Sequence, residues 1–216
     1  MSDPWAFGWT QVFTILGFLI TVGIAIGGFR TFNRWKREKI EEKRIDTAID
    51  ALQYVAESKF MLDSIRAEMT FDHEWESMPQ FPGDNEGRRG QRGPAYAILK
   101  RIEGAKEFFD RGWRLQARCG AIFGPELEET FLLLQRARRE MEVAAEMLTR
   151  DPHPTHNTED NRDTWNMLRA ALWASYGRLA KEGDKVGAKL TQFRSEVEAA
   201  CRPVVDREFG RAKKRS

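Results

Sequence analysis

The most distinctive pattern in the chain is a long run of apolar residues close to its N-terminus. Residues 9–29 read WTQVFTILGFLITVGIAIGGF, and the polar side chains among them are those of Thr10, Gln11, Thr14 and Thr21. A helix of this length reaches about 31 Å, close to the hydrocarbon thickness of roughly 30 Å. A segment that crosses a bilayer alone must satisfy its backbone internally, so the run predicts one transmembrane helix.

The residues on either side of this run support the same prediction. Aromatic side chains gather at both ends, as in the interfacial belts of membrane helices; they are Trp5, Phe7 and Trp9, then Phe29, Phe32 and Trp35. A cleaved signal peptide would begin with basic residues and carry a shorter apolar run, whereas this chain begins Met-Ser-Asp. A buried core helix is normally shorter and interrupted by polar residues.

Beyond residue 30 the apolar positions recur every three or four residues, which is typical of amphipathic helices. We expect helical stretches at about 31–70, 94–124 and 125–150, and a last one from about residue 163. No stretch alternates as a β-strand would. Two segments rich in proline, glycine and charge, near residues 71–93 and 151–162, are expected to be mobile loops.

Each stretch has a stripe of apolar residues that we expect to be buried. The first stripe is Ile45, Ala48, Leu52, Val55, Leu62, Ile65 and Met69, and the second is Ile98, Ile102, Ala105, Phe109 and Trp113. The third is Leu127, Leu134, Met141 and Leu148, with Phe131 and Ala145 between them. The last comprises Trp165, Leu168, Leu172, Tyr176 and Leu179 up to Gly183, then Val186, Leu190, Phe193, Val197, Ala200 and Val204, with Pro203 expected to kink or end the helix nearby.

These patterns predict an all-α protein, in which a single transmembrane helix precedes a cytoplasmic antiparallel bundle of about four helices. The expected organisation is a short extracytoplasmic N-terminus (1–8), the span (9–29), a basic juxtamembrane segment (30–44), the helical domain (45–210) and a basic tail (211–216). The first stretch contains no helix breaker, so it can continue the span as one helix.

The composition of the whole chain is uninformative, but the charge of its separate segments differs. The whole sequence is 41% hydrophobic and 31% charged, with a net charge of +2, which alone describes an ordinary soluble protein. Residues 4–29, however, contain no charge. Residues 1–44 have a net charge of +3 and the tail has +4, so residues 45–210 must carry −5. A mildly acidic domain argues against general nucleic-acid binding.

The distribution of basic residues predicts the orientation of the span. Residues 30–44 hold seven Lys and Arg residues, whereas the N-terminal side holds none. The positive-inside rule therefore places residues 1–8 outside and the rest of the chain in the cytoplasm. A bacterial inner membrane is the expected location. The first cations are expected to lie against lipid headgroups; they are Arg30, Arg34, Lys36 and Arg37.

Small residues within the span suggest that it can self-associate. Thr14, Gly17, Thr21, Ala25 and Gly28 recur at three- and four-residue spacing and define one face, while Gly23 and Gly27 form a second small-xxx-small pair. Such faces allow two helix backbones to approach closely in a membrane. Glycine is common in membrane helices in general, which is the alternative explanation.

Residues able to carry chemistry are few. His153 and His156 lie near Asp151 in a short loop, the one arrangement that could hold a metal ion. A solvated proline-rich loop is the simpler interpretation, because no cysteine lies nearby. The Glu-x-x-His pairs of di-iron bundles and the common phosphate-loop and hydrolase motifs are absent. No cofactor is therefore expected.

Two further groups of residues have simple structural interpretations. Cys119 and Cys201 lie in predicted helices among apolar neighbours, so we expect both to be buried rather than reactive. Three arginines lie among glycines, at positions 88, 89 and 92, and could contact RNA or lipid. A solvated, charged loop is the simpler reading of that segment.

The sequence therefore predicts a membrane-anchored helical protein without an evident catalytic site. We expect a protein-interaction or scaffold role at the cytoplasmic membrane face, with a protein partner or a second copy as ligand. The alternatives are a module that binds anionic lipid through its basic ends and an enzyme with an unfamiliar metal-assisted site.

Overall fold

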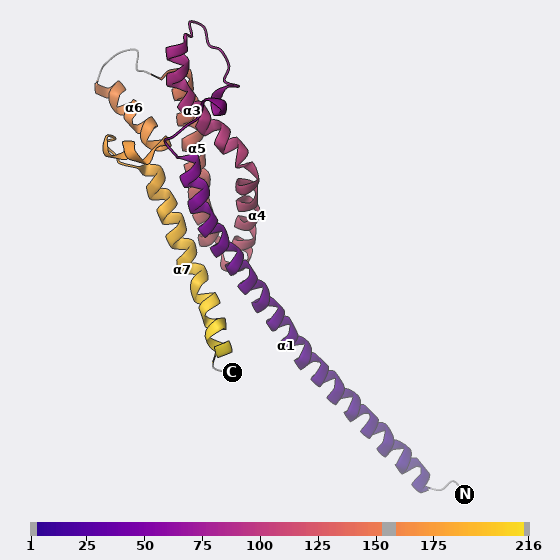
Figure 1. The fold of residues 1–216 in the computed structure, drawn as a ribbon. Coiled ribbons are helices and arrows are strands. Elements are labelled where there is room, and N and C mark those ends of the chain that lie inside the picture. The colour runs from indigo at the N-terminus through magenta and orange to yellow at the C-terminus, as the bar shows by residue number, and fades with distance from the viewer. Residues whose placement is uncertain (1–3, 153–158, 214–216) are drawn as a thin grey trace. The chain divides into compact units, whose positions relative to one another are not determined.

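The computed structural model describes residues 4–152 and 159–213. Within these residues the chain forms seven α-helices and a short 3-10 helix, and no strand (Figure 1). The all-α prediction is thus confirmed for the described part. The chain divides into two compact units, Met1–Asp46 and Thr47–Ser216.

Helix α1 is a single helix from Pro4 to Ile65. Pro4 suits a first helical turn, and no further proline occurs before Pro79, so nothing interrupts the backbone hydrogen bonds. The apolar segment and the first amphipathic stretch are therefore parts of one helix, a question that the sequence left open. The helix ends four residues before Met69, which is 72% exposed rather than buried as predicted.

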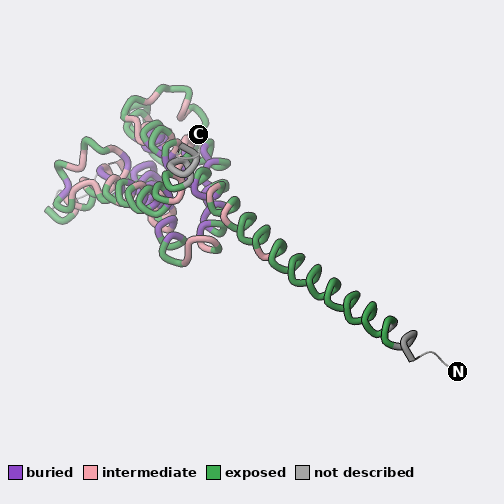
Figure 2. The backbone as a smooth tube through the Cα atoms, turned by 90° about the horizontal axis from the view of Figure 1, so that it is seen from below, coloured by how far each residue is buried: buried purple, intermediate pink, exposed green. Residues whose placement is uncertain are grey.

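The first unit consists of the N-terminal part of α1. Its residues whose burial is described are almost all exposed, including those of the apolar segment (Figure 2). Among the described residues, α1 is the one helix that is long and apolar enough to cross a membrane.

The second unit contains the C-terminal part of α1 and all later helices. These are α2 (Asp72–Trp75), α3 (Glu86–Gly104), α4 (Lys106–Phe123), α5 (Pro125–Arg150), α6 (Glu159–Leu172), the 3-10 helix η1 (Ala174–Arg178) and α7 (Lys185–Lys213). Helix α5 packs against α3, α4, α6 and α7. All six predicted stripe residues of α5 are buried, from Leu127 to Leu148.

A cluster of four aromatic side chains lies in the core of this unit. Tyr54 of α1 stacks on Phe108 of α4, with ring centroids 4.7 Å apart. Its ring also lies 6.2 Å from that of Phe131 and 6.5 Å from that of Phe193, on α5 and α7. Burial on this scale supplies most of the stabilisation of a helical domain, at about 1.5–3 kcal/mol for each large apolar side chain.

The second predicted stretch differs from the structure in two places. Its helix begins at Glu86 rather than Pro94, because Asn85 caps it by accepting a hydrogen bond from the Arg88 backbone N–H at 2.8 Å. The stretch is also divided at Ala105 into α3 and α4. Trp113, expected in the core, is 60% exposed, and its neighbour Gly112 is buried instead.

The C-terminal region also departs from the prediction. The helix expected to run to Gly183 ends at Leu172, and Leu179 beyond it is 61% exposed. In α7 the buried position is Cys201 rather than Ala200. Pro203 does not end α7, which continues to Lys213. Proline has no backbone N–H and so cannot donate to the carbonyl of Ala199, one turn earlier in the helix. Ala199 is exposed, so water can donate to that carbonyl instead.

Candidate functional site

Two parts of the molecule present surfaces with functional potential, one in each unit. In the first unit it is the apolar segment of α1. Twelve large apolar side chains between Trp9 and Phe29 are 38–71% exposed. The hydroxyl of Thr21 donates to the Gly17 carbonyl at 2.9 Å, so this polar group is satisfied within the helix. Such internal bonding is what a hydrocarbon environment requires.

The small residues of this segment have free space around them. A methyl group added at Gly17, Gly23, Gly27 or Gly28 would meet no atom within 4 Å. The segment is therefore open to packing by another helix on either predicted face. Both faces remain predictions, because only one copy of the chain is described.

The predicted headgroup residues follow directly. Arg30, Arg34, Lys36 and Arg37 are all exposed. Arg34 pairs with Glu38 one helical turn later, with 2.9 Å between Nε and Oε1. Arg37 donates through Nε to the backbone carbonyl of Asn33 at 3.3 Å.

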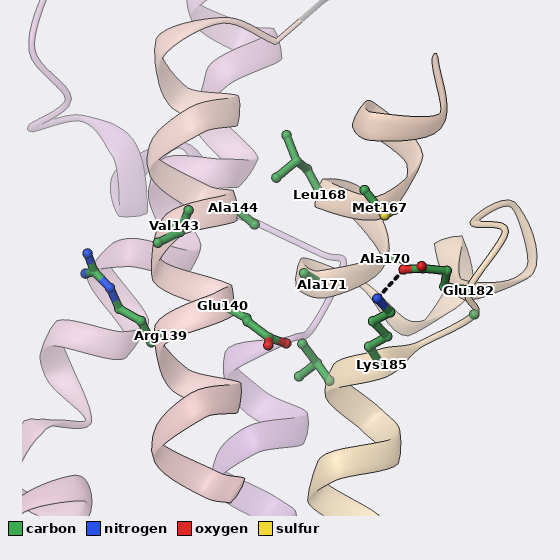
Figure 3. A pocket seen from close by; sticks show the side chains of 12 residues that line it. Arg139, Glu140, Val143, Ala144, Met167, Leu168, Ala170, Ala171, Glu182 and Lys185 are labelled. Atoms are coloured by element: carbon green, nitrogen blue, oxygen red, sulfur yellow. Dashed lines mark ion pairs between the residues drawn. The ribbon is translucent and has the colours of Figure 1, made fainter. Parts of the chain in front are cut away.

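In the second unit, α5, α6 and the beginning of α7 enclose a pocket of about 350 Å³ (Figure 3). This volume falls in the range of roughly 300–1,000 Å³ found for ligand pockets. Its wall is mainly apolar and includes Val143, Ala144, Met167, Leu168, Ala171 and Val186. Met167 is 42% exposed, so this apolar side chain is accessible from the surface.

Each charged residue that lines this pocket has an oppositely charged partner. Glu140 accepts from the Nζ of Lys189 at 2.5 Å, and Glu182 pairs with Lys185. Arg139 extends to the side of α5 away from α6 (Figure 3). The pocket therefore offers an apolar cavity with no free charge directed into it, which suits an apolar side chain better than an ion.

A partly buried arginine supports one wall of the pocket. The guanidinium of Arg66 donates to the carbonyl of Ala170 at 2.9 Å and to both carboxylate oxygens of Asp184, at 2.9 and 3.0 Å. Asp184 in turn accepts from the backbone N–H of Gly187 at 2.8 Å and so holds the first turn of α7. This arrangement joins the ends of α1 and α6 to the start of α7.

The arginine–glycine segment is explained by internal contacts. Arg89 donates to the Glu76 carbonyl at 2.9 Å and Arg88 to the Gly83 carbonyl at 3.3 Å. Arg92 is buried and pairs with Asp84. These three residues lie in the first turns of α3 and hold the preceding loop, so they are not part of a solvated loop. Contact of this segment with RNA or lipid stays a prediction.

Both cysteines are buried, as predicted. Burial raises the pKa of the Cys119 thiol to about 12 and that of Cys201 to about 11. Because the thiolate is the reactive form, neither side chain is suited to nucleophilic chemistry at neutral pH.

The predicted metal site is only partly described. His153 and His156 lie outside the described residues, while Asp151 is exposed at the C-cap of α5. The part of the chain that the structure describes contains no group of three or more His, Cys, Asp or Glu side chains arranged to hold a metal ion. The His153–His156 site therefore stays a prediction.

Comparison with known protein families, with curated proteins and with solved structures gives no match for this chain.

Proposed function

We propose that the chain is a single-pass membrane protein that holds a helical, protein-binding domain at the cytoplasmic face of a membrane. The observation that carries this proposal is the exposure of twelve large apolar side chains between Trp9 and Phe29. A contiguous apolar surface of this extent requires a covering, and a bilayer covers all sides of a helix at once.

The orientation rests on charge. Four cations follow the apolar segment within residues 30–37, and no Lys or Arg precedes it. We therefore place the N-terminus outside and the helical domain in the cytoplasm, with a bacterial inner membrane as the proposed location.

Contacts within the second unit support an antiparallel helical bundle. Asp50 pairs with Arg118 and Glu57 with Arg111, so residue numbers rise along α1 as they fall along α4. The same holds for α5 and α7, where Lys189 meets Glu140 and Glu196 meets Thr130.

The pocket between α5, α6 and α7 is the proposed surface for a protein partner. Its apolar wall and its mutually paired rim charges fit an apolar side chain of another protein. Methionine at the opening adapts its shape to different partners. Truncating a side chain that fills such a pocket typically costs 2 kcal/mol or more of binding free energy in interfaces of this kind.

Alkaline extraction of membranes tests the anchor. The wild-type chain should stay in the membrane pellet, and a Leu19→Arg/Ile20→Arg variant should move to the supernatant, since each arginine at a span centre costs about 2.5–3.5 kcal/mol. Met69→Arg/Leu179→Arg, which adds the same two arginines at exposed positions outside the span, is the matched control. Extraction of the wild-type chain with the soluble fraction would exclude the anchor.

Site-specific photo-crosslinking tests the protein-binding surface. A crosslinker at position 167, at the pocket, should give a defined adduct that an Ala171→Trp change removes by filling the cavity. A crosslinker at position 69, which is exposed elsewhere on the domain, is the control. Equal adducts from both positions, or an adduct that survives Ala171→Trp, would contradict docking at the pocket.

A further inference from the structure

Within the predicted basic segment of residues 30–44, the net positive charge lies in the first eight residues. Residues 30–37 contain four basic and no acidic side chains, whereas residues 38–46 contain three basic and four acidic ones. The net charge therefore changes from +4 to −1 at Glu38. The positive charge is confined to the first two helical turns beyond the apolar segment.

Most of these four cations are not neutralised by the protein itself. Arg34 pairs with Glu38. Arg30, Lys36 and Arg37 are exposed, and no carboxylate contacts them among the described residues. Beyond this point the pairing is internal, as Lys39 donates to Glu42 at 2.6 Å. The free positive charge thus lies directly beside the apolar segment.

The cluster is longer than the headgroup layer that it adjoins, but its long basic side chains can reach back into that layer. Eight residues of helix span about 12 Å, and the polar headgroup region on each side of the hydrocarbon core is about 5–8 Å thick. Side chains as long as arginine reach beyond their own backbone position. The acidic residues begin at Glu38, beyond this layer.

The same two turns also have an aromatic face. Arg30, Arg34 and Arg37 share one face through their four- and three-residue spacing. The rings of Phe32 and Trp35 lie 5.9 Å apart on another face of the helix. Aromatic rings at this depth anchor a helix at the interface, which holds the arginines at the level of the phosphates.

We propose that residues 30–37 bind the headgroups of anionic phospholipids through Arg30, Lys36 and Arg37. This inference rests on the proposed function, because it requires the apolar segment to be in a bilayer. Guanidinium groups bind phosphate oxygens in bidentate fashion, and lysine adds a point charge. The ligand is the lipid rather than free phosphate, since the cluster adjoins the apolar segment.

The experiment compares two charge-matched variants of the full chain in nanodiscs of phosphatidylcholine with a minority of phosphatidylglycerol. Arg30→Gln/Lys36→Gln/Arg37→Gln removes the cluster, whereas Lys39→Gln/Lys43→Gln/Arg44→Gln removes the same charge from the next two turns. After mild detergent extraction, mass spectrometry counts the lipids of each class that remain bound. The wild-type chain and the second variant should retain phosphatidylglycerol in excess over its bulk fraction. The first variant should retain at least about fivefold less phosphatidylglycerol than the wild type.

Equal retention in the two variants, or no enrichment in the wild-type chain, would overturn the inference. Loss of the lipid on adding inorganic phosphate, but not chloride at the same ionic strength, would make free phosphate the ligand and would also overturn it. Failure of the wild-type chain to enter phosphatidylcholine nanodiscs would instead remove the proposed anchor, and with it this inference.

Discussion

At the scale of single residues, the core depends on small side chains as much as on large ones. Tyr54 lies flat between Phe108 and its aromatic neighbours, and its hydroxyl donates to the Phe108 carbonyl at 3.4 Å. Its ring can take this position because Gly112 has no side chain. A Cβ at Gly112 would lie 2.2 Å from the Tyr54 hydroxyl oxygen.

Gly112→Ala should therefore destabilise the domain by about 1–3 kcal/mol, the usual cost of overpacking a well-filled core. The measurement is the urea midpoint of unfolding followed by circular dichroism. Gly104→Ala is the control, because its added methyl group meets no atom within 4 Å, and it should leave stability unchanged or raise it by up to about 1 kcal/mol. Equal midpoints for the two variants would contradict this account of the core.

A second residue-scale prediction concerns pH. The hydrogen bonds from the Arg101 guanidinium hold the pKa of Glu74 below its ordinary value of 4.5. A carboxyl group with a lowered folded-state pKa stabilises the protein above its unfolded pKa, and this contribution is lost as the pH falls through the folded value. The difference in urea midpoint between wild type and Glu74→Gln should thus be constant above about pH 5 and shrink below it.

Glu68→Gln provides the comparison for this pH series, since Glu68 is exposed and has no arginine partner among the described residues. Its midpoint should follow that of the wild type across the whole series. A Glu74→Gln difference that persists unchanged to pH 3 would show that the Arg101 contact does not depend on the charge of the carboxylate.

For the stretch that forms α3 and α4, the sequence pattern placed four apolar residues in the core correctly but chose the wrong position for the next buried residue. Ile98, Ile102, Ala105 and Phe109 are buried as predicted, and continuing their four-three spacing leads to Gly112, not Trp113. A search for large apolar side chains selects the tryptophan because glycine carries no hydrophobic signal. The correct position could have been found from spacing alone.

At the scale of helices, the sequence predicted a helix correctly where its capping residues and its apolar stripe indicated the same bounds. Helix α5 begins with Pro125 after Gly124, whose φ of +101° suits glycine, and its whole stripe is buried. Helix α3 was predicted to begin eight residues late, because its first two turns are rich in glycine and arginine. Tertiary contacts with the preceding loop decide that region, and a local pattern cannot show them.

The two small-residue faces of α1 lead to a discriminating prediction. If the apolar segment of α1 self-associates through the first face, Gly17→Leu/Gly28→Leu should reduce energy transfer between labelled copies in detergent micelles, because bulky side chains keep the backbones apart. Gly23→Leu/Gly27→Leu places the same bulk on the other face and should leave the signal intact. The reverse result would assign the contact to the second face, and no change in either variant would rule out both.

At the scale of the whole molecule, the near-zero net charge results from cancellation between zones. An uncharged apolar segment, a short basic segment and a mildly acidic domain follow one another along the chain. This organisation could be read from the sequence, as it depends on order along the chain. The pocket could not, because its wall combines three helices whose spatial arrangement no local pattern specifies.

Cysteine labelling tests the proposed orientation. A membrane-impermeant maleimide should label a Ser2→Cys variant on intact cells, and a Ser195→Cys variant only after lysis, since Ser195 is exposed on α7 in the helical domain. The unmodified protein is its own control. Cys119 and Cys201 are buried with raised pKa values and should react only in denaturant. Labelling of Ser195→Cys on intact cells would show that the protein has the opposite orientation.

The contact between Tyr54 and Phe193 has a consequence for biosynthesis. These side chains lie 139 positions apart in the sequence, yet their rings meet at 6.5 Å in the core. During translation, the apolar segment leaves the ribosome long before α7 is made. In the proposed topology the anchor would therefore enter the bilayer while the domain that it carries still lacks its last helix. Folding of that domain would then be completed on a chain already tethered to the membrane, where diffusion is confined to two dimensions.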